Sequence, residues 1–230
     1  MLDFSGYSVI TFDCYGTLID WETGILGSIR PILSAHGAAL SDSEILRLYG
    51  ELEADAESSE YRSYREVLCN VVHGFGTRLG FHATEEQQRS LSDSMGAWAP
   101  FPDTVAALLR LKTKFKLGII SNVDDDLFSA TAPQLKINFD YVTTAARARA
   151  YKPSLEIFRL AQETMGVRAE NWLHAGQSIY HDVIPAKSLG ISTVWVNRPS
   201  VRPNAGAARQ ASAVPDLEVR SLVELARLAD

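Results

Sequence analysis

Most of this 230-residue chain alternates short apolar runs with stretches of helical periodicity. Short apolar runs separated by helices predict βαβ units and a parallel sheet. Right-handed crossovers would then bring the carboxyl ends of all the strands to one edge of that sheet. The sequence therefore predicts an α/β protein built on a doubly wound parallel sheet. The apolar runs lie at residues 7–13, 116–121, 141–144, 172–175 and 193–197, and the helical patterns at 105–111, 127–135, 154–165 and 182–189.

A long, mostly polar stretch between residues 19 and 98 interrupts this alternation. Apolar residues recur there at helical spacing, and the tetrapeptide that begins at Ser41 is typical of a helix start. We therefore expect residues 1–18 and 99–230 to form an α/β core and residues 19–98 to form an inserted all-helical domain. Residues 198–214, rich in Pro, Ala, Gly and Ser, are expected to form a surface loop.

Composition excludes several classes of function. The net charge is -6, with 22 basic and 28 acidic residues, so the sequence offers no basic face for nucleic acid. No apolar stretch approaches the roughly 20 residues that a membrane span needs, and no basic segment precedes an apolar leader. Cys14 and Cys69 form no metal-binding or disulfide pattern. We expect a cytoplasmic protein with no membrane or nucleic-acid partner.

The first apolar run ends in Asp13, which is followed by Gly16 and Thr17 in a predicted tight turn. In open α/β sheets, ligands bind outside the carboxyl ends of the strands. A carboxylate delivered to that edge is a candidate nucleophile. The alternative interpretation is that Asp13 merely ends a strand and the nearby Tyr15 packs against the core.

Two later segments carry further polar residues. Ser121 and Asn122 end the second run and could bind an anion through a hydroxyl and nearby backbone N–H groups, or could cap a helix. Lys152 precedes Pro153, which favours an extended backbone and holds the ammonium in a defined place. A single lysine is otherwise most often a solvated surface charge.

The fourth polar segment runs from Gly176 to Asp182. Asp182 is either a functional carboxylate or a helix N-terminal acid that the helix dipole favours. Two histidines flank this segment. We expect His174 to be a partly buried strand residue and His181 a loop residue, rather than a pair of metal ligands.

These four segments resemble, in order, the four signatures of the haloacid dehalogenase superfamily. The segment from Asp13 to Leu18 resembles the first signature, and Ser121, Lys152 and Asp182 fall at the second, third and fourth. The resemblance covers essentially the whole chain and implies a Rossmann-like core with the helical insert as a cap. The first segment looks most similar to the type II (S)-2-haloacid dehalogenases.

Tyr15 stands where phosphatases of this superfamily carry a second aspartate that protonates the leaving group. An alkoxide needs such a proton and a halide does not, and tyrosine, with a pKa of about 10, is a weak acid for this task. The resemblance therefore implies that Asp13 displaces halide from a small 2-haloalkanoic acid. Water would then hydrolyse the aspartyl ester and release a hydroxy acid.

The resemblance also implies roles for the other residues. Lys152 would orient Asp13 and offset negative charge, with Asp182 completing the catalytic group and no cofactor required. The substrate is expected to be a small anion. The residues expected to bind it are Tyr15, Thr17, Ser121, Asn122, Gln177 and Ser178.

The cap departs from the dehalogenase pattern. Haloacid dehalogenases place an arginine on the second cap helix to draw out the halide, and this chain has Gly50 there. Arg62 and Arg65 are candidates to replace it, because guanidinium groups bind anions well. The same two residues could equally form a solvated helix face.

Two other functions remain open. One is a magnesium-dependent phosphatase of a small phosphorylated metabolite, with Asp13 and Asp182 as metal ligands. Gln177 replaces the first acid of the fourth signature, which should weaken magnesium binding. The other is a non-catalytic member that binds a metabolite. Exposed apolar faces on the cap helices could also pair two copies into a homodimer.

Overall fold

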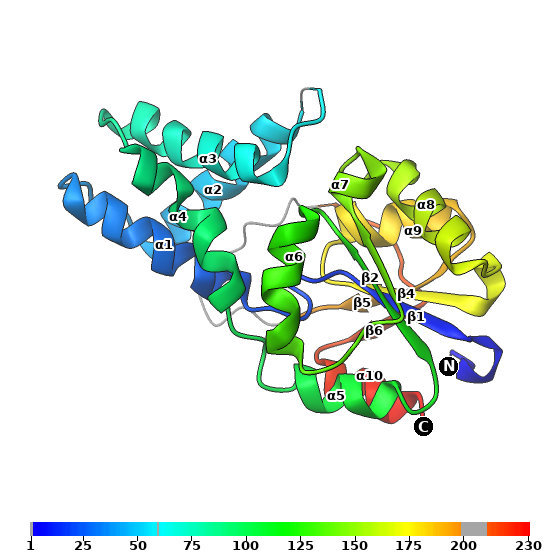
Figure 1. The fold of residues 1–230 in the computed structure, drawn as a ribbon. Helices are drawn as coiled ribbons and strands as arrows, with labels where there is room; N and C mark the ends of the chain where they lie inside the picture. The colour runs from blue at the N-terminus through cyan, green and yellow to red at the C-terminus, as the bar shows by residue number, and fades with distance from the viewer. Residues whose placement is uncertain (1, 59, 199–210) are drawn as a thin grey trace.

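Six parallel strands form one sheet in the order β3-β2-β1-β4-β5-β6 (Figure 1). The computed structural model describes residues 2–58, 60–198 and 211–230. The α/β fold predicted from the sequence is confirmed. Most of the loop predicted at 198–214 lies outside the described residues. The strands are β1 Val9–Phe12, β2 Lys116–Ser121, β3 Tyr141–Thr144, β4 Trp172–Gly176, β5 Ser192–Val196 and β6 Leu217–Val219.

Helices cover both faces of the sheet. Ile10 and Phe12 share an apolar cluster with residues of α5 (Thr104–Leu111), α6 (Asp125–Thr131) and α10 (Leu222–Leu228). Val9 and Trp172 share a second cluster with residues of α7 (Ala145–Ala148), α8 (Leu155–Met165) and α9 (Ile184–Ser188). Alternate residues of a strand point to opposite faces, and burial on both sides explains why the strands form continuous apolar runs. In the described residues, no helix is both long and apolar enough to cross a bilayer.

The strand order reverses between β1 and β4. The chain adds β2 and β3 on one side of β1 and β4, β5 and β6 on the other. In open α/β sheets, ligands bind at such a switch point, beyond the carboxyl ends of the strands. Asp13 directly follows β1 and therefore lies at this point.

Four helices between β1 and α5 form the helical insert, which stands apart from the sheet (Figure 1). Three of them begin with capping boxes, at Ser41, Ser63 and Thr84, which confirms the helix start predicted at Ser41. These caps fix where each helix begins and hence which face it turns to the core. The helices are α1 Trp21–Ala35, α2 Asp42–Glu57, α3 Tyr64–Leu79 and α4 Glu85–Ser94.

Gly24 allows α1 to pack closely against the segment that returns to the core. A Cβ atom at this position would overlap the ring of Trp98. Trp98 in turn meets Tyr15 edge-on, with ring centroids 6.0 Å apart. This contact therefore joins the insert to the turn that follows β1.

We predict that Gly24→Ala destabilises the protein, whereas Gly27→Ala on the same helix stabilises it. Overpacking against Trp98 costs about 1–3 kcal/mol. At Gly27 nothing lies within 4 Å of an added Cβ, so alanine contributes only its helix propensity, up to about 1 kcal/mol. Urea unfolding of both variants measures the difference. Equal stabilities would show that Trp98 does not constrain α1.

Candidate active site

The ammonium of Lys152 lies between two carboxylates at the switch point. Its Nζ donates hydrogen bonds to Oδ1 of Asp13 at 2.8 Å, to Oδ1 of Asp182 at 2.7 Å and to the carbonyl of Ile120 at 3.0 Å. These bonds engage all three N–H groups of the ammonium. The Lys152 side chain is only 2% exposed, so the ion pairs are shielded from water. The structure thus brings together the three residues that the sequence suggested as the catalytic group.

Burial and charge act in opposite directions on these groups. Burial raises the pKa of Asp13, Lys152 opposes the increase and Asp182 adds to it. Burial alone would also raise the pKa of Asp182, but Lys152 and His174 bring that pKa below its usual range. Burial alone would lower the pKa of Lys152, but the two carboxylates raise it above its usual value. The site therefore holds a permanent cation beside Asp13 at neutral pH.

The turn after β1 fixes the second oxygen of Asp13. The Thr17 hydroxyl donates to Oδ2 of Asp13 at 2.7 Å and accepts from the backbone N–H of Gln177 at 2.9 Å. Gly16 has a φ of 93°, a left-handed conformation that glycine adopts without strain, which lets the turn bring Thr17 back to Asp13. Both Asp13 oxygens are thus oriented, as a nucleophile requires.

Asp182 is also held by the segment that precedes it. The backbone N–H of Ser178 donates to its Oδ2 at 3.2 Å. A Cβ at Gly176 would overlap the Asp182 carboxylate, so only glycine leaves room for it at the end of β4. The helix predicted at 182–189 is corrected: a π-helical turn over Ile179–Val183 contains Asp182, and α9 follows. Asp182 is therefore not the N-terminal acid of α9.

A chain of buried hydrogen bonds reaches Asp182 from the opposite side. The Trp172 indole donates to Oγ1 of Thr11 at 2.7 Å, and this oxygen lies 2.8 Å from Nδ1 of His174. Because the Trp172 indole can only donate, the Thr11 oxygen accepts from it and can donate its own proton to Nδ1 of His174. The imidazole proton then lies on Nε2. Nε2 lies 3.3 Å from Oδ1 of Asp182. His174, expected to be partly buried, is fully buried and positions the carboxylate.

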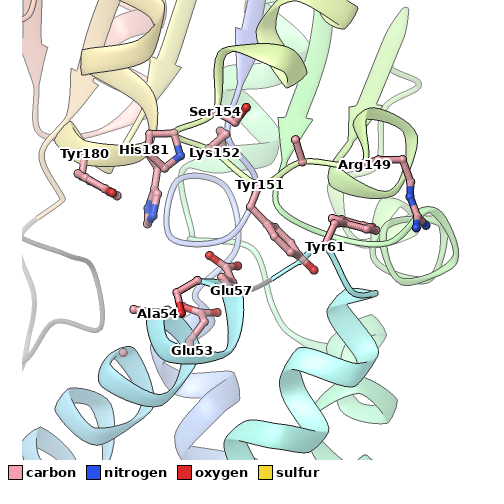
Figure 2. Close-up of a pocket in the computed structure, with 14 residues that line it drawn as sticks. Glu53, Ala54, Glu57, Tyr61, Arg149, Tyr151, Lys152, Ser154, Tyr180 and His181 are labelled. Atoms are coloured by element: carbon pink, nitrogen blue, oxygen red, sulfur yellow. The ribbon is translucent and has the colours of Figure 1, made fainter.

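A pocket opens over Asp13 between the strand ends and the helical insert. It adjoins a cavity of about 450 Å³ that extends past Lys152 toward Tyr151 and Ser154 (Figure 2). The pocket and the cavity are both lined by Lys152 and His181 of the core and by Glu53 and Glu57 of α2. The hollow at Asp13 itself is about 60 Å³, and a small substrate that enters it reaches the nucleophile from the larger cavity.

The residues expected to bind substrate divide into two groups. Tyr15, Ser121, Asn122, Gln177 and Ser178 line the pocket at Asp13, whereas Thr17 is fully buried beneath it. Within the described part of the chain, the Ser121 hydroxyl has no hydrogen-bond partner, so it is available to a ligand.

Asn122 has another task. Its side-chain oxygen accepts the backbone N–H of Lys152 at 2.7 Å, and its amide nitrogen donates to the Lys152 carbonyl at 3.2 Å. This clamp fixes the loop that carries the ammonium. Asn122 also lines the pocket, so a contact with substrate stays a prediction.

Tyr15 is not placed as a proton donor. Its hydroxyl lies 2.8 Å from Oγ1 of Thr131, and burial raises its pKa well above the usual value. The hydroxyl is thus engaged with α6 rather than presented to a leaving group. This geometry agrees with the weak acidity argued from the sequence.

The two insert arginines lie outside this pocket, which corrects the expectation that they replace a halide-binding arginine. Arg65 pairs with Asp126 at 2.7 Å and with Asp93 at 3.3 Å, and Arg62 and Arg65 line a separate hollow. Tyr64, one residue earlier, does line the pocket. Successive helical residues point about 100° apart, so α3 turns Arg65 away.

The described residues offer a magnesium ion fewer acids than the phosphatase pattern does. Asp13 and Asp182 share the Lys152 ammonium, and the third acid expected of phosphatases is Gln177. Among the residues that the structure describes, no group of three or more His, Cys, Asp or Glu side chains could hold a metal ion. A magnesium ion here would therefore have two carboxylates, Asp13 and Asp182, as charged ligands and would have to compete with the Lys152 ammonium for both.

Comparisons with known proteins identify the family. The family model of haloacid dehalogenase-like hydrolases matches residues 7–190. The chain belongs to this family. It is 27% identical over 222 residues to an (S)-2-haloacid dehalogenase of Pseudomonas fluorescens, covering 93% of this chain and 92% of the relative. It is 28% identical over 172 residues to a glyceraldehyde 3-phosphate phosphatase of Methanothermobacter thermautotrophicus, covering 70% and 71%.

The fold is shared with solved members of the family. The L-2-haloacid dehalogenase of Xanthobacter autotrophicus superposes with a TM-score of 0.81 at 22% identity, covering 96% of this chain and 98% of that one. Together with the family match, this likeness shows a hydrolase of the haloacid dehalogenase type with the expected Rossmann-like core.

Sequence reasoning missed several side chains of the pocket. Trp21, Tyr64 and the glutamates Glu53 and Glu57 of α2 also line it. The two glutamates are four residues apart and therefore share one helix face. Their spacing was readable in the sequence, but the direction of that face depends on how the insert packs on the core.

We predict that His174→Gln lowers turnover about tenfold, as expected for loss of a hydrogen bond to a charged group. The pKa of Asp182 should also rise. His174 helps to keep the pKa of Asp182 low, so without it Asp182 is protonated at a higher pH. Thr11→Val should act in the same direction, and His82→Gln, an exposed histidine, should change nothing. Undiminished turnover in a folded His174→Gln variant would contradict this positioning role.

We predict that Lys152→Met abolishes turnover and destabilises the protein most strongly near neutral pH. Removing one partner of a buried ion pair costs about 3–5 kcal/mol. The pKa values of Asp13 and Asp182 would then exceed their unfolded values, so the loss should grow as pH rises from about 4 to 7. Adding Asp13→Asn should recover part of it. Urea unfolding across this pH range measures how the loss of unfolding free energy depends on pH. A loss that does not change with pH would contradict the account.

Proposed function

We propose that the protein hydrolyses a small 2-haloalkanoic acid through a covalent ester of Asp13. The observation that carries the proposal is the oriented Asp13 carboxylate, bound by Lys152 and Thr17 at the base of a pocket. The adjacent Tyr15 hydroxyl is engaged by Thr131, which suits a leaving group that needs no proton. In this proposal the helical insert, residues 19–98, serves as the cap.

The first step is a displacement by Asp13. One carboxylate oxygen attacks the carbon that bears the halogen, in line with the carbon–halogen bond. That bond breaks as the ester bond forms, and the halide leaves with the electron pair. Lys152 remains charged and orients the carboxylate, because Asp182 holds the other side of its ammonium. The substrate carboxylate would contact the free Ser121 hydroxyl.

The second step is hydrolysis of the ester. Water adds to the carbonyl carbon of Asp13, and the bond to the alkyl oxygen breaks to release the hydroxy acid. Hydrogen bonds from Lys152 and Thr17 would stabilise the negative charge on the tetrahedral intermediate. The balance for both steps is one water consumed and one hydroxy acid, one halide ion and one proton released.

The named relatives support this choice of reaction. Several curated relatives are (S)-2-haloacid dehalogenases, and one solved neighbour, with a TM-score of 0.81, is described with chloropropionic acid covalently bound. A covalent adduct in that protein matches the nucleophile role proposed here for Asp13.

We predict halide release from chloroacetate or from one enantiomer of 2-chloropropanoate with chelator present. Asp13→Asn should reduce this release by about a thousandfold or more, because the substitution removes the nucleophile. Asp126→Asn, which removes an exposed carboxylate outside the pocket, should retain activity. Halide release from a folded Asp13→Asn variant would contradict the nucleophile assignment.

Other outcomes would favour the alternatives. Phosphate release from phosphate esters that requires magnesium and stops with chelator would favour the phosphatase. Ligand-induced stabilisation without any turnover would favour a binding protein.

A further inference from the structure

The insert side of the pocket is acidic. The face of α2 that lines it carries Gly50, Glu53 and Glu57, with Lys152 and His181 opposite (Figure 2). From the resemblance, an arginine was expected at Gly50. The helix face that would present a cation to a halide thus presents two carboxylates instead.

Glu53 is held in place by two tyrosine hydroxyls. Tyr49 and Tyr64 donate to its Oε1 at 2.9 and 2.5 Å, and both rings are buried. Burial raises the pKa of Glu53, and the two hydroxyls oppose that increase. The network therefore fixes one oxygen of this carboxylate and leaves the side chain at the pocket wall.

Glu57 has no such support. Within the described residues, no hydrogen bond reaches its carboxylate, although the side chain lines both hollows. Burial raises its pKa well above the usual value, and the charge of Glu53 adds to the increase. The Glu57 side chain is only partly buried, so its carboxylate is accessible from the pocket, and a cation brought by a ligand would offset its repulsion with Glu53.

The described cations of the pocket are already engaged. Lys152 uses its three N–H groups on Asp13, Asp182 and a carbonyl. The Arg149 guanidinium lies over the ring of Tyr61, 4.4 Å from its centroid, and points away from α2 (Figure 2).

We propose that Glu53 and Glu57 bind a primary ammonium group of the substrate, so that the substrate is a 2-halo acid that also carries an amine. The inference rests on the proposed function for the reacting end of the molecule and names the group at its other end. The carboxylate would lie near Ser121, the halogen-bearing carbon at Asp13 and the ammonium against α2. Asp13, Ser121, Glu53 and Glu57 all line the hollow of about 60 Å³ at the nucleophile, and the two glutamates also line the adjoining cavity of about 450 Å³.

Two matched chlorides test the proposal. 4-Amino-2-chlorobutanoate and 2-chloropentanoate have the same chain length and differ only in an ammonium or a methyl group at the end. We expect kcat/KM for chloride release to favour the aminated acid by about tenfold or more, as for hydrogen bonds between charged groups. Calorimetry with the corresponding hydroxy acids, 4-amino-2-hydroxybutanoate and 2-hydroxypentanoate, measures affinity without any need for turnover.

Variants assign the preference to the two carboxylates. Glu57→Gln and Glu53→Gln should each remove most of the preference for the aminated acid. Glu51→Gln is the matched control, because Glu51 lies on the same helix and pairs with Arg47 at the surface. It should keep the full preference. Glu57→Gln keeps the test valid if Glu53→Gln disturbs the tyrosine network.

The outcomes separate this inference from the proposed reaction. Release from 2-chloropentanoate with no preference for the amine would overturn the inference and leave the reaction standing. Binding of the aminated hydroxy acid that depends on Glu57, without chloride release from either acid, would support the inference and overturn the reaction. A preference that survives both glutamine substitutions would also overturn the inference.

Discussion

The structure depends on one buried ammonium shared by two carboxylates. Lys152 joins Asp13 at the end of β1 to Asp182 after β4, residues that lie far apart in the chain. Three buried charges in one place are unfavourable unless each is paired and hydrogen-bonded, and here every N–H of the ammonium has an acceptor. The same arrangement that makes burial of these charges tolerable also orients Asp13 toward the pocket.

The surroundings of this group explain how it stays in place. Thr17 fixes the second oxygen of Asp13, Asn122 clamps the backbone of Lys152, and His174 supports Asp182 from within the sheet. Each of these contacts comes from the core, whereas the opposite wall of the pocket comes from the insert. In the proposed function the core supplies the reacting groups, and the insert, with Glu53 and Glu57, selects the substrate.

The strand pattern predicted that Asp13 lies at the carboxyl edge of a parallel sheet. The roles of Lys152 and Asp182 were implied by the resemblance to the four signatures. The sequence did not predict how side chains turn within that edge. Asn122 and Lys152 are separated by 30 residues, and nothing local indicates that the amide binds the Lys152 backbone. Arg65 lies one residue beyond Tyr64 and faces away from the pocket, a difference of rotation that depends on the packing of α3.

The central claim is that Asp13 forms an ester that water hydrolyses at the carbonyl carbon. The most direct test is turnover in water enriched in oxygen-18, followed by mass spectrometry of the peptide that contains Asp13. The account predicts that heavy oxygen enters the Asp13 carboxylate over repeated turnovers, while the first hydroxy acid released carries the original light oxygen. Hydroxy acid labelled from the first turnover, with an unlabelled Asp13, would contradict it and show that water attacks the substrate directly.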